Sequence, residues 1–548
     1  MLITPTRKFT LNENQVWLLI TAMVVLLQFS ALWVPILEPD GALYAGISKQ
    51  MVLRHDYWNL YADGRDWLDK PHFPFWMVAL SFNIFGIHTW SYKLPAILFS
   101  LMGAWYTYRF ALSLYNEQVA RWAVCILLTA EHLVISNNDV RAEPYLTGLI
   151  IAAVYFFYQK KILPGAIFAA CAVMTKGPFA LVPIGAAIGG QLLFTRNWRE
   201  LLHWRWLLAA VLIALFITPE LYALYHQFDQ HPEKIVFGRT GVSGLRFFFW
   251  DSQFGRFMNT GPIKGAGDPF FFFHTLLWAF LPWSIMLYAA VILFIRRWKQ
   301  QTEYYCICGA LATFLLFSLS KFQLPHYLNI IFPFFAILTA NYILSQQSER
   351  WMKFFRTTQY TIIILIAILG TVIDLLYKPA MHYAWLIPAG ALILLYVLLH
   401  NWLDKSTKAA VFYRTIAISI LLNLYLNTIL YPDMMRYQSG SEAARYANAS
   451  LPGTTVALYG DNSYAFDFYL HAPVARYDST TILPALAASP KVLFATPQAV
   501  ASLQQKGFTC EVIQSFPHFR VSKLDLPFVR KATRVSTLEE RELVRVRK

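Results

Sequence analysis

Residues 33–45 read Trp33-Val34-Pro35-Ile36-Leu37-Glu38-Pro39-Asp40-Gly41-Ala42-Leu43-Tyr44-Ala45, and they follow an apolar run that starts near residue 16. The two prolines restrict the backbone where this run ends. We therefore expect Asp40 to stand on a stiff, non-helical segment, before a helix that begins at about Ala42. A carboxylate at such a boundary is either a solvated loop end or a chemical group.

The composition is that of a membrane protein. Of 548 residues, 57% are hydrophobic and 17% aromatic, and only 14% are charged, so most of the chain belongs in lipid. The formal net charge of +15 is scattered among short loops, which favours anionic lipid head groups and phosphorylated substrates as partners and argues against nucleic acid. The five cysteines offer neither a disulfide framework nor a zinc spacing.

Apolar runs that could be membrane helices recur up to residue 431, among them 270–295 and 383–400. If every run crossed the membrane, basic loops would lie on both sides, against the positive-inside rule. The conflict disappears if residues 71–87 form a re-entrant or surface-lying hairpin. We therefore predict a polytopic α-helical protein with about thirteen crossings and a cytoplasmic N-terminus. The loops 38–70, 137–143 and 227–269 would then share the outer face with everything after residue 432.

The loop 38–70 contains an amphipathic segment. Leu43, Ile47 and Met51 form an apolar stripe at four-residue spacing, and the other side carries Ser48, Lys49, Gln50 and Arg54. We expect this helix to lie in the plane of the membrane interface, with its polar side toward water, and to hold Asp40 at head-group depth.

The composition changes at about residue 438, where charged and small residues return. We predict a transmembrane domain over 1–437 and a small soluble α/β domain over 438–548. Strand-like segments at 455–459, 473–477, 491–495, 510–513 and 519–523 alternate with helix-like segments at 441–449, 463–470, 481–488 and 497–506. The last twenty or so residues show no buried pattern and are expected to form a frayed tail.

Ionisable residues collect on the predicted outer face. Carboxylates there could act as a general base or bind a divalent cation, and cations could hold a phosphate. Ordinary alternatives exist, because an acid can stabilise a helix N-terminus and a lysine can extend its ammonium to the membrane surface. The candidates are Asp40, Asp69, Lys70, Asp139, Arg141, Glu143, Lys176, Arg256 and Lys321.

Transfer of a sugar from a polyprenyl phosphate needs both kinds of group at a lipid-facing site. Negative charge develops on the phosphate oxygens and positive charge at the anomeric carbon as the bond breaks. Lysine and arginine stabilise the phosphate, and an aspartate can deprotonate or orient the acceptor.

Several blocks of the chain resemble the aminoarabinose-to-lipid A transferases and the wider protein-mannosyltransferase-like GT-C glycosyltransferases. They are the stretch 38–51, Asp69-Lys70-Pro71 with Trp76, Met174-Thr175-Lys176-Gly177-Pro178, Pro269-Phe270-Phe271-Phe272, Leu281-Pro282-Trp283 and the stretch 318–327. The resemblance runs over about residues 30–345 and implies a GT-C fold and an inverting transferase that uses a polyprenyl-phosphate sugar.

The resemblance also implies roles for particular residues. Asp40 matches the catalytic-loop carboxylate, and Asp69 and Glu143 match acidic positions near it, so these three are the candidate catalytic residues. Lys70 and Lys176 would contact phosphate. We place Arg141, Arg256 and Lys321 around the donor phosphate as well. Family members can bind a divalent cation at the acidic cluster, for which Asp40, Asp139 and Glu143 are the candidates in this chain.

The chain departs from the family pattern at three positions. Gly41 follows Asp40 where the family usually has Glu, Asp69 replaces a Glu, and Glu143 stands where Asp is usual. These changes are compatible with the same reaction class. They do not tell which sugar is transferred, nor whether the acceptor is lipid A or another envelope glycan or lipid.

The expected enzyme is thus a bacterial inner-membrane glycosyltransferase with a periplasmic active site. A transporter or flippase of lipid-linked sugars is the first alternative, and it would place ionisable residues at the midplane of paired, broken helices. The others are a protein O-mannosyltransferase-like enzyme and a membrane-anchored binding module whose C-terminal domain does the work.

Overall fold

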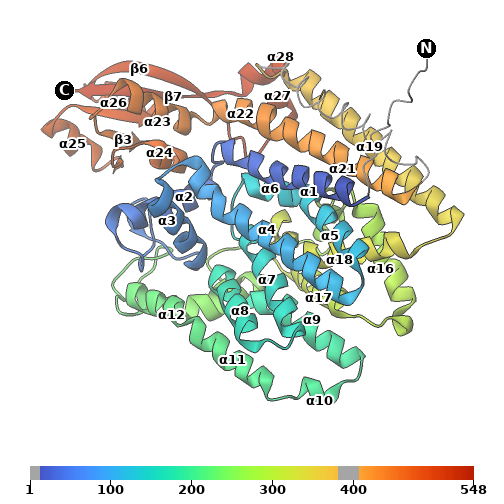
Figure 1. Ribbon diagram of the computed structural model, residues 1–548. Helices are drawn as coiled ribbons and strands as arrows, with labels where there is room; N and C mark the ends of the chain where they lie inside the picture. The colour runs from blue at the N-terminus through green and yellow to red at the C-terminus, as the bar shows by residue number, and fades with distance from the viewer. Residues whose placement is uncertain (1–12, 381–389, 391–406) are drawn as a thin grey trace, which may run out of the picture.

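The computed structural model describes residues 13–380, 390 and 407–548. The predicted run 383–400 falls, apart from residue 390, outside the described residues, as do residues 1–12, on which the predicted side of the N-terminus depends. The described chain is a large helical body with a smaller mixed α/β unit at one end (Figure 1).

The helical body is built mainly from apolar helices joined by short turns. Four helices in the described ranges are long and apolar enough to cross a membrane, or up to six if each of two bent helix pairs is one span. About thirteen crossings were predicted, which is more than the four to six helices that meet this criterion of length and composition. The principal helices are α1 (Glu13–Ser30), α2 (Asp40–Arg54), α3 (Phe73–Phe85), α4 (Thr89–Leu114), α5 (Glu117–Thr129), α6 (Glu131–Asn138), α7 (Glu143–Tyr158), α8 (Ile162–Lys176), α9 (Leu181–Phe194), α10 (Trp198–Leu201), α11 (Arg205–Phe216), α12 (Thr218–Leu224), α15 (Phe271–Ala279), α16 (Ser284–Arg296), α17 (Tyr305–Leu319), α18 (Phe332–Ser345), α19 (Glu349–Tyr377), α21 (Lys408–Tyr425) and α22 (Tyr431–Met434).

Two predicted runs differ in detail from the observed helices. The run 270–295 is not one helix, because α15 and α16 are separated at residues 280–283, where Pro282 has no backbone N–H to continue a helical ladder. The segment 71–87 forms α3, whose 13 residues are too few to cross a bilayer of ordinary thickness, since that needs about 20. The segment is one helix and not the predicted hairpin.

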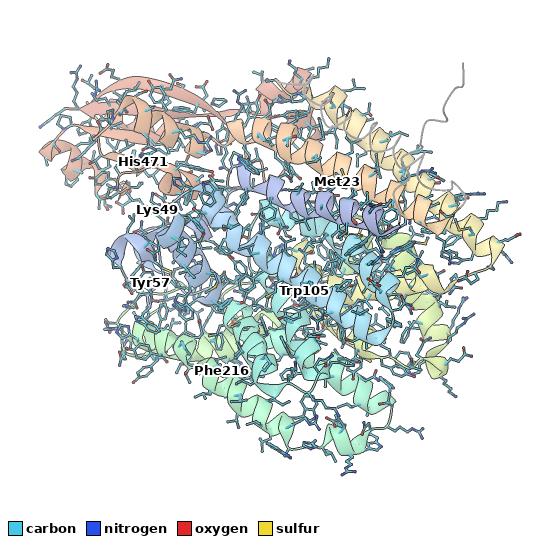
Figure 2. All side chains as sticks on the ribbon, viewed as in Figure 1. Met23, Lys49, Tyr57, Trp105, Phe216 and His471 are labelled. Carbon is cyan, nitrogen blue, oxygen red and sulfur yellow. The ribbon has the colours of Figure 1, made fainter. Side chains whose placement is uncertain are left out.

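The helix α2 begins at Asp40, two residues earlier than expected, and most of its residues are buried or half-buried. Ile47 and Met51 are buried with Phe75 of α3, as the apolar stripe predicts. The opposite side was expected to face water. That holds for Arg54, which is exposed, but not for Lys49, which is only 6% exposed and lies where α2 meets the C-terminal unit (Figure 2). The covering element comes some 400 residues later in the chain, so local periodicity could not reveal it.

The C-terminal unit contains a five-stranded sheet in the order β4-β3-β5-β7-β6. Strands β3, β4 and β5 are parallel, whereas β7 runs antiparallel to both β5 and β6. The strands are β3 (Val456–Tyr459), β4 (Ala475–Tyr477), β5 (Lys491–Ala495), β6 (Thr509–His518) and β7 (Glu539–Arg547), and the helices are α23 (Ser439–Ser450), α24 (Tyr464–Tyr469), α25 (Ile482–Ala488), α26 (Pro497–Gln505), α27 (Leu526–Val529) and α28 (Lys531–Arg534).

The last strand corrects two expectations. Residues 519–523 are not a strand, and the supposed frayed tail forms β7, inside the sheet. Leu543, Val544 and Val546 of β7 are fully buried, and they contribute to apolar clusters that also involve α23 and α24, or α25 and α26. The many arginines and glutamates in this segment gave it the composition of an exposed tail. The sequence pattern therefore did not reveal a strand with both faces covered.

Candidate functional site

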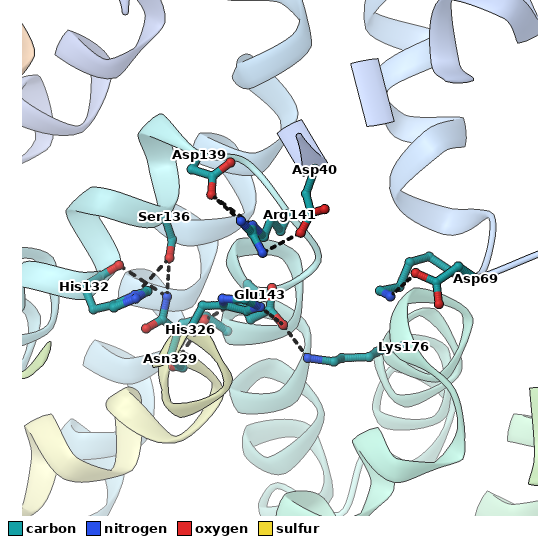
Figure 3. A network of polar contacts seen from close by, with 12 residues as sticks. Asp40, Asp69, His132, Ser136, Asp139, Arg141, Glu143, Lys176, His326 and Asn329 are labelled. Atoms are coloured by element: carbon teal, nitrogen blue, oxygen red, sulfur yellow. Dashed lines mark hydrogen bonds and ion pairs between the residues drawn. The ribbon is translucent and has the colours of Figure 1, made fainter. Parts of the chain in front are cut away.

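Asp40 is the first residue of α2, and its side chain is about one third exposed (37%). Oδ2 of Asp40 lies 2.6 Å from Nη1 of Arg141, and Nη2 of the same guanidinium lies 2.8 Å from Oδ2 of Asp139. Burial lowers the pKa of Arg141, but Asp139 and Asp40 outweigh it, so the pKa is raised. Arg141 therefore stays charged and joins two carboxylates from different segments (Figure 3).

A second group forms just before α3. The carboxylate of Asp69 binds the ammonium of Lys70 at 2.6 Å and also the guanidinium of Arg256 in α14 (Arg256–Met258). Burial raises the pKa of Asp69, yet these two cations outweigh burial and bring the pKa below its usual value. Burial also lowers the pKa of Lys70. Two cations thus share one carboxylate.

A third group lies between α7 and α8. Glu143, the first residue of α7, binds the ammonium of Lys176, the last residue of α8. The next residue, Gly177, has a φ of +95°, a conformation that favours glycine and ends α8 at the cation. The Lys176 ammonium also lies 3.6 Å from the centre of the Tyr327 ring, a cation–π contact.

These three groups line one polar cavity of about 160 Å³, together with Tyr44 and His326. Beside it is a larger, mainly apolar cavity of about 390 Å³ that is lined by Phe247, Phe248, Phe249 and Phe254, among others. The two cavities share six lining residues: Asp69, Lys70, Lys176, Arg256, Phe322 and Tyr327. A charged head with an apolar chain would find both environments at this boundary.

The charges of the second and third groups do not cancel, whereas the first group, Asp40 and Asp139 with Arg141, has a net charge of −1. Lys70, Lys176 and Arg256 supply three positive charges, whereas Asp69 and Glu143, which neutralise them, supply two negative charges. One positive charge remains in a largely desolvated place, where Coulomb interactions are strong. It matches the single negative charge of a phosphodiester.

A buried pair of residues, His72 and Glu220, holds the segment that carries Asp69 and Lys70. His72 and Glu220 are both inaccessible to solvent, and Glu220 accepts hydrogen bonds from the His72 backbone N–H at 2.9 Å and from Nδ1 at 3.1 Å. This pair fixes the start of α3 directly after Asp69 and Lys70.

Nearly all of the predicted site residues come together. Asp40, Asp69, Lys70, Arg141, Glu143, Lys176 and Arg256 line the polar cavity, and Asp139 is bound to Arg141. Lys321 is the exception, because its side chain is exposed and it lines neither cavity.

The lining residues that were not predicted include Tyr44, Gln253, His326 and Tyr327. Tyr44 and Tyr327 stand inside stretches that were singled out for their charged members, so neighbourhood in sequence was an available signal. Gln253 gave none. Its amide donates to the backbone carbonyl of Lys176 at 3.3 Å, from a π-helical segment (Phe247–Gly255) 77 residues farther along the chain.

The predicted divalent-cation site is not formed. In the part of the chain that the structure describes, no three His, Cys, Asp or Glu side chains are grouped as a metal ion requires. Asp40 and Asp139 are bound to Arg141, and Glu143 is bound to Lys176. The positions that a metal would take beside these carboxylates are filled by the protein's own cations.

The fold has a known counterpart. The structure is similar over 98% of both chains to ArnT from Cupriavidus metallidurans bound to undecaprenyl phosphate, with a TM-score of 0.75 at 17% identity. The chain shares the GT-C fold of this protein. The apo form of the same ArnT gives a TM-score of 0.71, so the GT-C fold predicted from the sequence motifs is confirmed.

Sequence comparisons agree with the GT-C fold. The family described as dolichyl-phosphate-mannose-protein mannosyltransferase matches residues 69–222. The undecaprenyl phosphate-alpha-4-amino-4-deoxy-L-arabinose arabinosyl transferase 1 of Pseudomonas fluorescens (strain Pf0-1) is 27% identical over 343 residues, which cover 59% of this chain and 56% of the relative. The corresponding transferase of Pseudomonas aeruginosa (strain UCBPP-PA14) is 28% identical over 58% of each chain. The chain thus spans somewhat over half the length of these relatives.

Proposed function

We propose that this protein is an inverting glycosyltransferase that moves a sugar from a polyprenyl-phosphate donor to a lipid acceptor such as lipid A. The observation that carries the proposal is the excess positive charge of Lys70, Lys176 and Arg256 at the boundary between a polar and an apolar cavity. The names of the relatives, which are transferases of an undecaprenyl-phosphate-linked aminosugar, support this donor class.

The donor would bind with its phosphate at these three cations and its sugar in the polar cavity. As the sugar–phosphate bond breaks, negative charge grows on the phosphate oxygens, and preorganised cations in a desolvated site stabilise it strongly. Asp69 and Glu143 hold the cations in place. They do not touch the sugar in this scheme.

Asp40 would act on the acceptor. It is the most exposed carboxylate of the site (37%), and it lines the same cavity as the phosphate-binding cations. An acceptor hydroxyl that approaches the anomeric carbon from the side opposite the phosphate can give its proton to Asp40, which is general base catalysis. Arg141 orients the Asp40 carboxylate through the 2.6 Å contact.

The polyprenyl chain would leave through apolar space. The cavity beside the cations shares Pro178 and Phe249 with a further apolar groove of about 520 Å³ between α9 and α11. Gly185 and Gly189 line this groove, and nothing lies within 4 Å of a Cβ built on either glycine. An isoprenoid tail needs such a continuous apolar path.

The membrane arrangement belongs to the same proposal. With about thirteen crossings and a cytoplasmic N-terminus, the site and the domain 438–548 lie on the periplasmic face of a bacterial inner membrane. The basic loops then stay in the cytoplasm, as the positive-inside rule requires.

Transfer of a labelled sugar tests the function. Purified protein is supplied with undecaprenyl phosphates that carry radiolabelled aminoarabinose or hexoses, together with lipid A, glycan and protein acceptors. We expect label in the lipid A fraction, and its absence from every acceptor fraction would refute the proposal. Label that crosses a proteoliposome membrane while still attached to its donor would identify a flippase instead.

A further inference from the structure

The C-terminal unit touches the polypeptide on both sides of Asp40. The side-chain amide of Gln438, which is 1% exposed, accepts a hydrogen bond from the Glu38 N–H at 2.9 Å and donates one to the Ile36 carbonyl at 3.0 Å. The hydroxyl of Tyr469 accepts from the Ile36 N–H at 2.9 Å. The backbone that leads into α2 is thus hydrogen-bonded by side chains from the far end of the chain.

The helix α24 is bound at both of its ends by residues near Asp40. At its start, Glu38 accepts hydrogen bonds from Ser463 Oγ at 2.7 Å and from the Ala465 N–H at 2.6 Å. At its end, the ammonium of Lys49 donates to the carbonyls of residues 467, 468 and 470 at 2.6–3.0 Å. An acid at the N-terminal end and a cation at the C-terminal end both suit the helix dipole.

A third contact lies farther along the same segment. The short hairpin of β1 (Tyr61–Ala62) and β2 (Arg65–Asp66) presents Asp63 to Arg476 of β4, with Oδ1 and Nη2 2.8 Å apart. The chain then continues to Asp69 and Lys70. Residues 36–66 are therefore held by the C-terminal unit before, within and after α2.

We propose that the C-terminal unit positions Asp40 for catalysis, with Gln438 and Lys49 as the positioning residues. The proposal rests on the proposed role of Asp40 as the general base. Neither positioning residue lines the polar or the apolar cavity. They act by fixing the two sides of Asp40, so that its carboxylate reaches both Arg141 and the acceptor.

The proposal separates two steps of the reaction. Arg256 and Lys176 belong to parts of the helical body that these contacts do not involve, and Lys70 follows the hairpin whose contact between Asp63 and Arg476 does not depend on Gln438 or Lys49. Donor binding should therefore survive when the contacts of Gln438 or Lys49 are lost. Proton transfer depends on sub-ångström placement of Asp40 and should not survive.

The test uses the full-length protein in detergent with Gln438→Ala and Lys49→Met. We expect kcat to fall about tenfold or more in each variant, because misplacement of about 1 Å can cost up to 100-fold, while the Kd for undecaprenyl phosphate stays unchanged. Arg545→Ala is the matched control, since Arg545 lies in β7 and makes only an exposed pair with Glu511. It should change neither quantity.

Hydrogen exchange gives an answer that does not depend on activity. In Gln438→Ala, the amides of residues 36–44 should exchange faster, while those of β5 and β7 keep their protection. If Gln438→Ala or Lys49→Met unfolds the C-terminal unit, Ser463→Ala is measured in its place, because it removes only one hydrogen bond to Glu38. Unchanged exchange at 36–44, unchanged kcat despite faster exchange, or a parallel loss of donor binding would each overturn the proposal. An unmodified protein that transfers no sugar would refute the function but not these contacts.

Discussion

The guanidinium of Arg141 joins Asp40 and Asp139, with Nη1 2.6 Å from one carboxylate and Nη2 2.8 Å from the other. These carboxylates come from segments about 100 residues apart, the start of α2 and the turn between α6 and α7. Burial raises the pKa of Asp139, which makes its charged form less favourable and Asp139 less suited to act as the general base. Asp40 is more exposed and lines the cavity, so Asp40 is the better candidate for the general base.

Replacing Asp40 by Asn should abolish transfer and leave the fold intact. The change removes a partly exposed charge without opening a cavity, and loss of a general base lowers kcat by about 100-fold or more. Turnover and the thermal unfolding midpoint measure the two effects. Glu117→Gln, an exposed change at the start of α5, is the control. If the Asp40→Asn enzyme keeps full activity, Asp40 is not the general base.

Lys70 should contribute to donor affinity rather than to acceptor activation. A charge-assisted hydrogen bond is worth about 1.5–3 kcal/mol, so Lys70→Met should raise the Kd for undecaprenyl phosphate by about 10–100-fold. Lys321→Met provides the matched control, because this exposed lysine lines neither cavity. Equal effects of the two changes would argue against a donor phosphate bound at Lys70.

Filling the apolar groove should make the enzyme sensitive to donor length. Gly189→Phe places a ring in the open space between α9 and α11, where it would obstruct a long isoprenoid but not a short one. KM should rise for an undecaprenyl donor and change little for a donor with two or three isoprene units. Leu207→Phe, on a residue of α11 that is 70% exposed, should affect neither donor. If Gly189→Phe changes KM equally for the long and the short donor, the isoprenoid tail does not bind in this groove.

The stability of the C-terminal unit should depend on pH through Asp467. Burial raises the pKa of Asp467 from 3.8 to about 6, although Arg476 opposes the shift. The folded chain therefore binds more protons than the unfolded chain between pH 4 and pH 6. This carboxylate makes the fold less stable as the pH rises through that interval, by up to about 3 kcal/mol.

Thermal unfolding at pH 4.5 and pH 6.5 tests this dependence. Asp467→Asn should lose less stability than the unmodified protein as the pH rises, whereas Glu442→Gln, on the partly exposed side of α23, should follow the unmodified protein. Identical slopes for all three proteins would contradict the assignment to Asp467.

The charged members of the site were predictable because charge is rare in an apolar chain. Asp40 and Lys176 stand at the ends of hydrophobic runs, and Asp69 with Lys70 comes directly before one. The cost of leaving such groups unpaired near lipid marks them in the sequence. The same rule selected Lys321, which points to solvent, because composition does not tell in which direction a side chain faces.

The pairing of the site residues could not be predicted. Whether Glu143 meets a metal ion or Lys176 depends on how α7 packs against α8, and nothing in the local sequence determines that contact. The same limit applies to Lys49 and to β7. In both cases, partners distant in the chain bury a segment whose own pattern is typical of exposed residues.

The position of β7 inside the sheet has a consequence for biosynthesis. The strand ends at residue 547, and β6 joins the rest of the sheet only through it. At roughly 5–20 residues per second, the ribosome completes this strand about half a minute to one and a half minutes after it has synthesised the first acidic loop. If Gln438 and Lys49 act as inferred, a nascent chain can insert its helices early but acquires a competent Asp40 only when translation has passed β7. Prematurely terminated products would then be catalytically silent in the membrane.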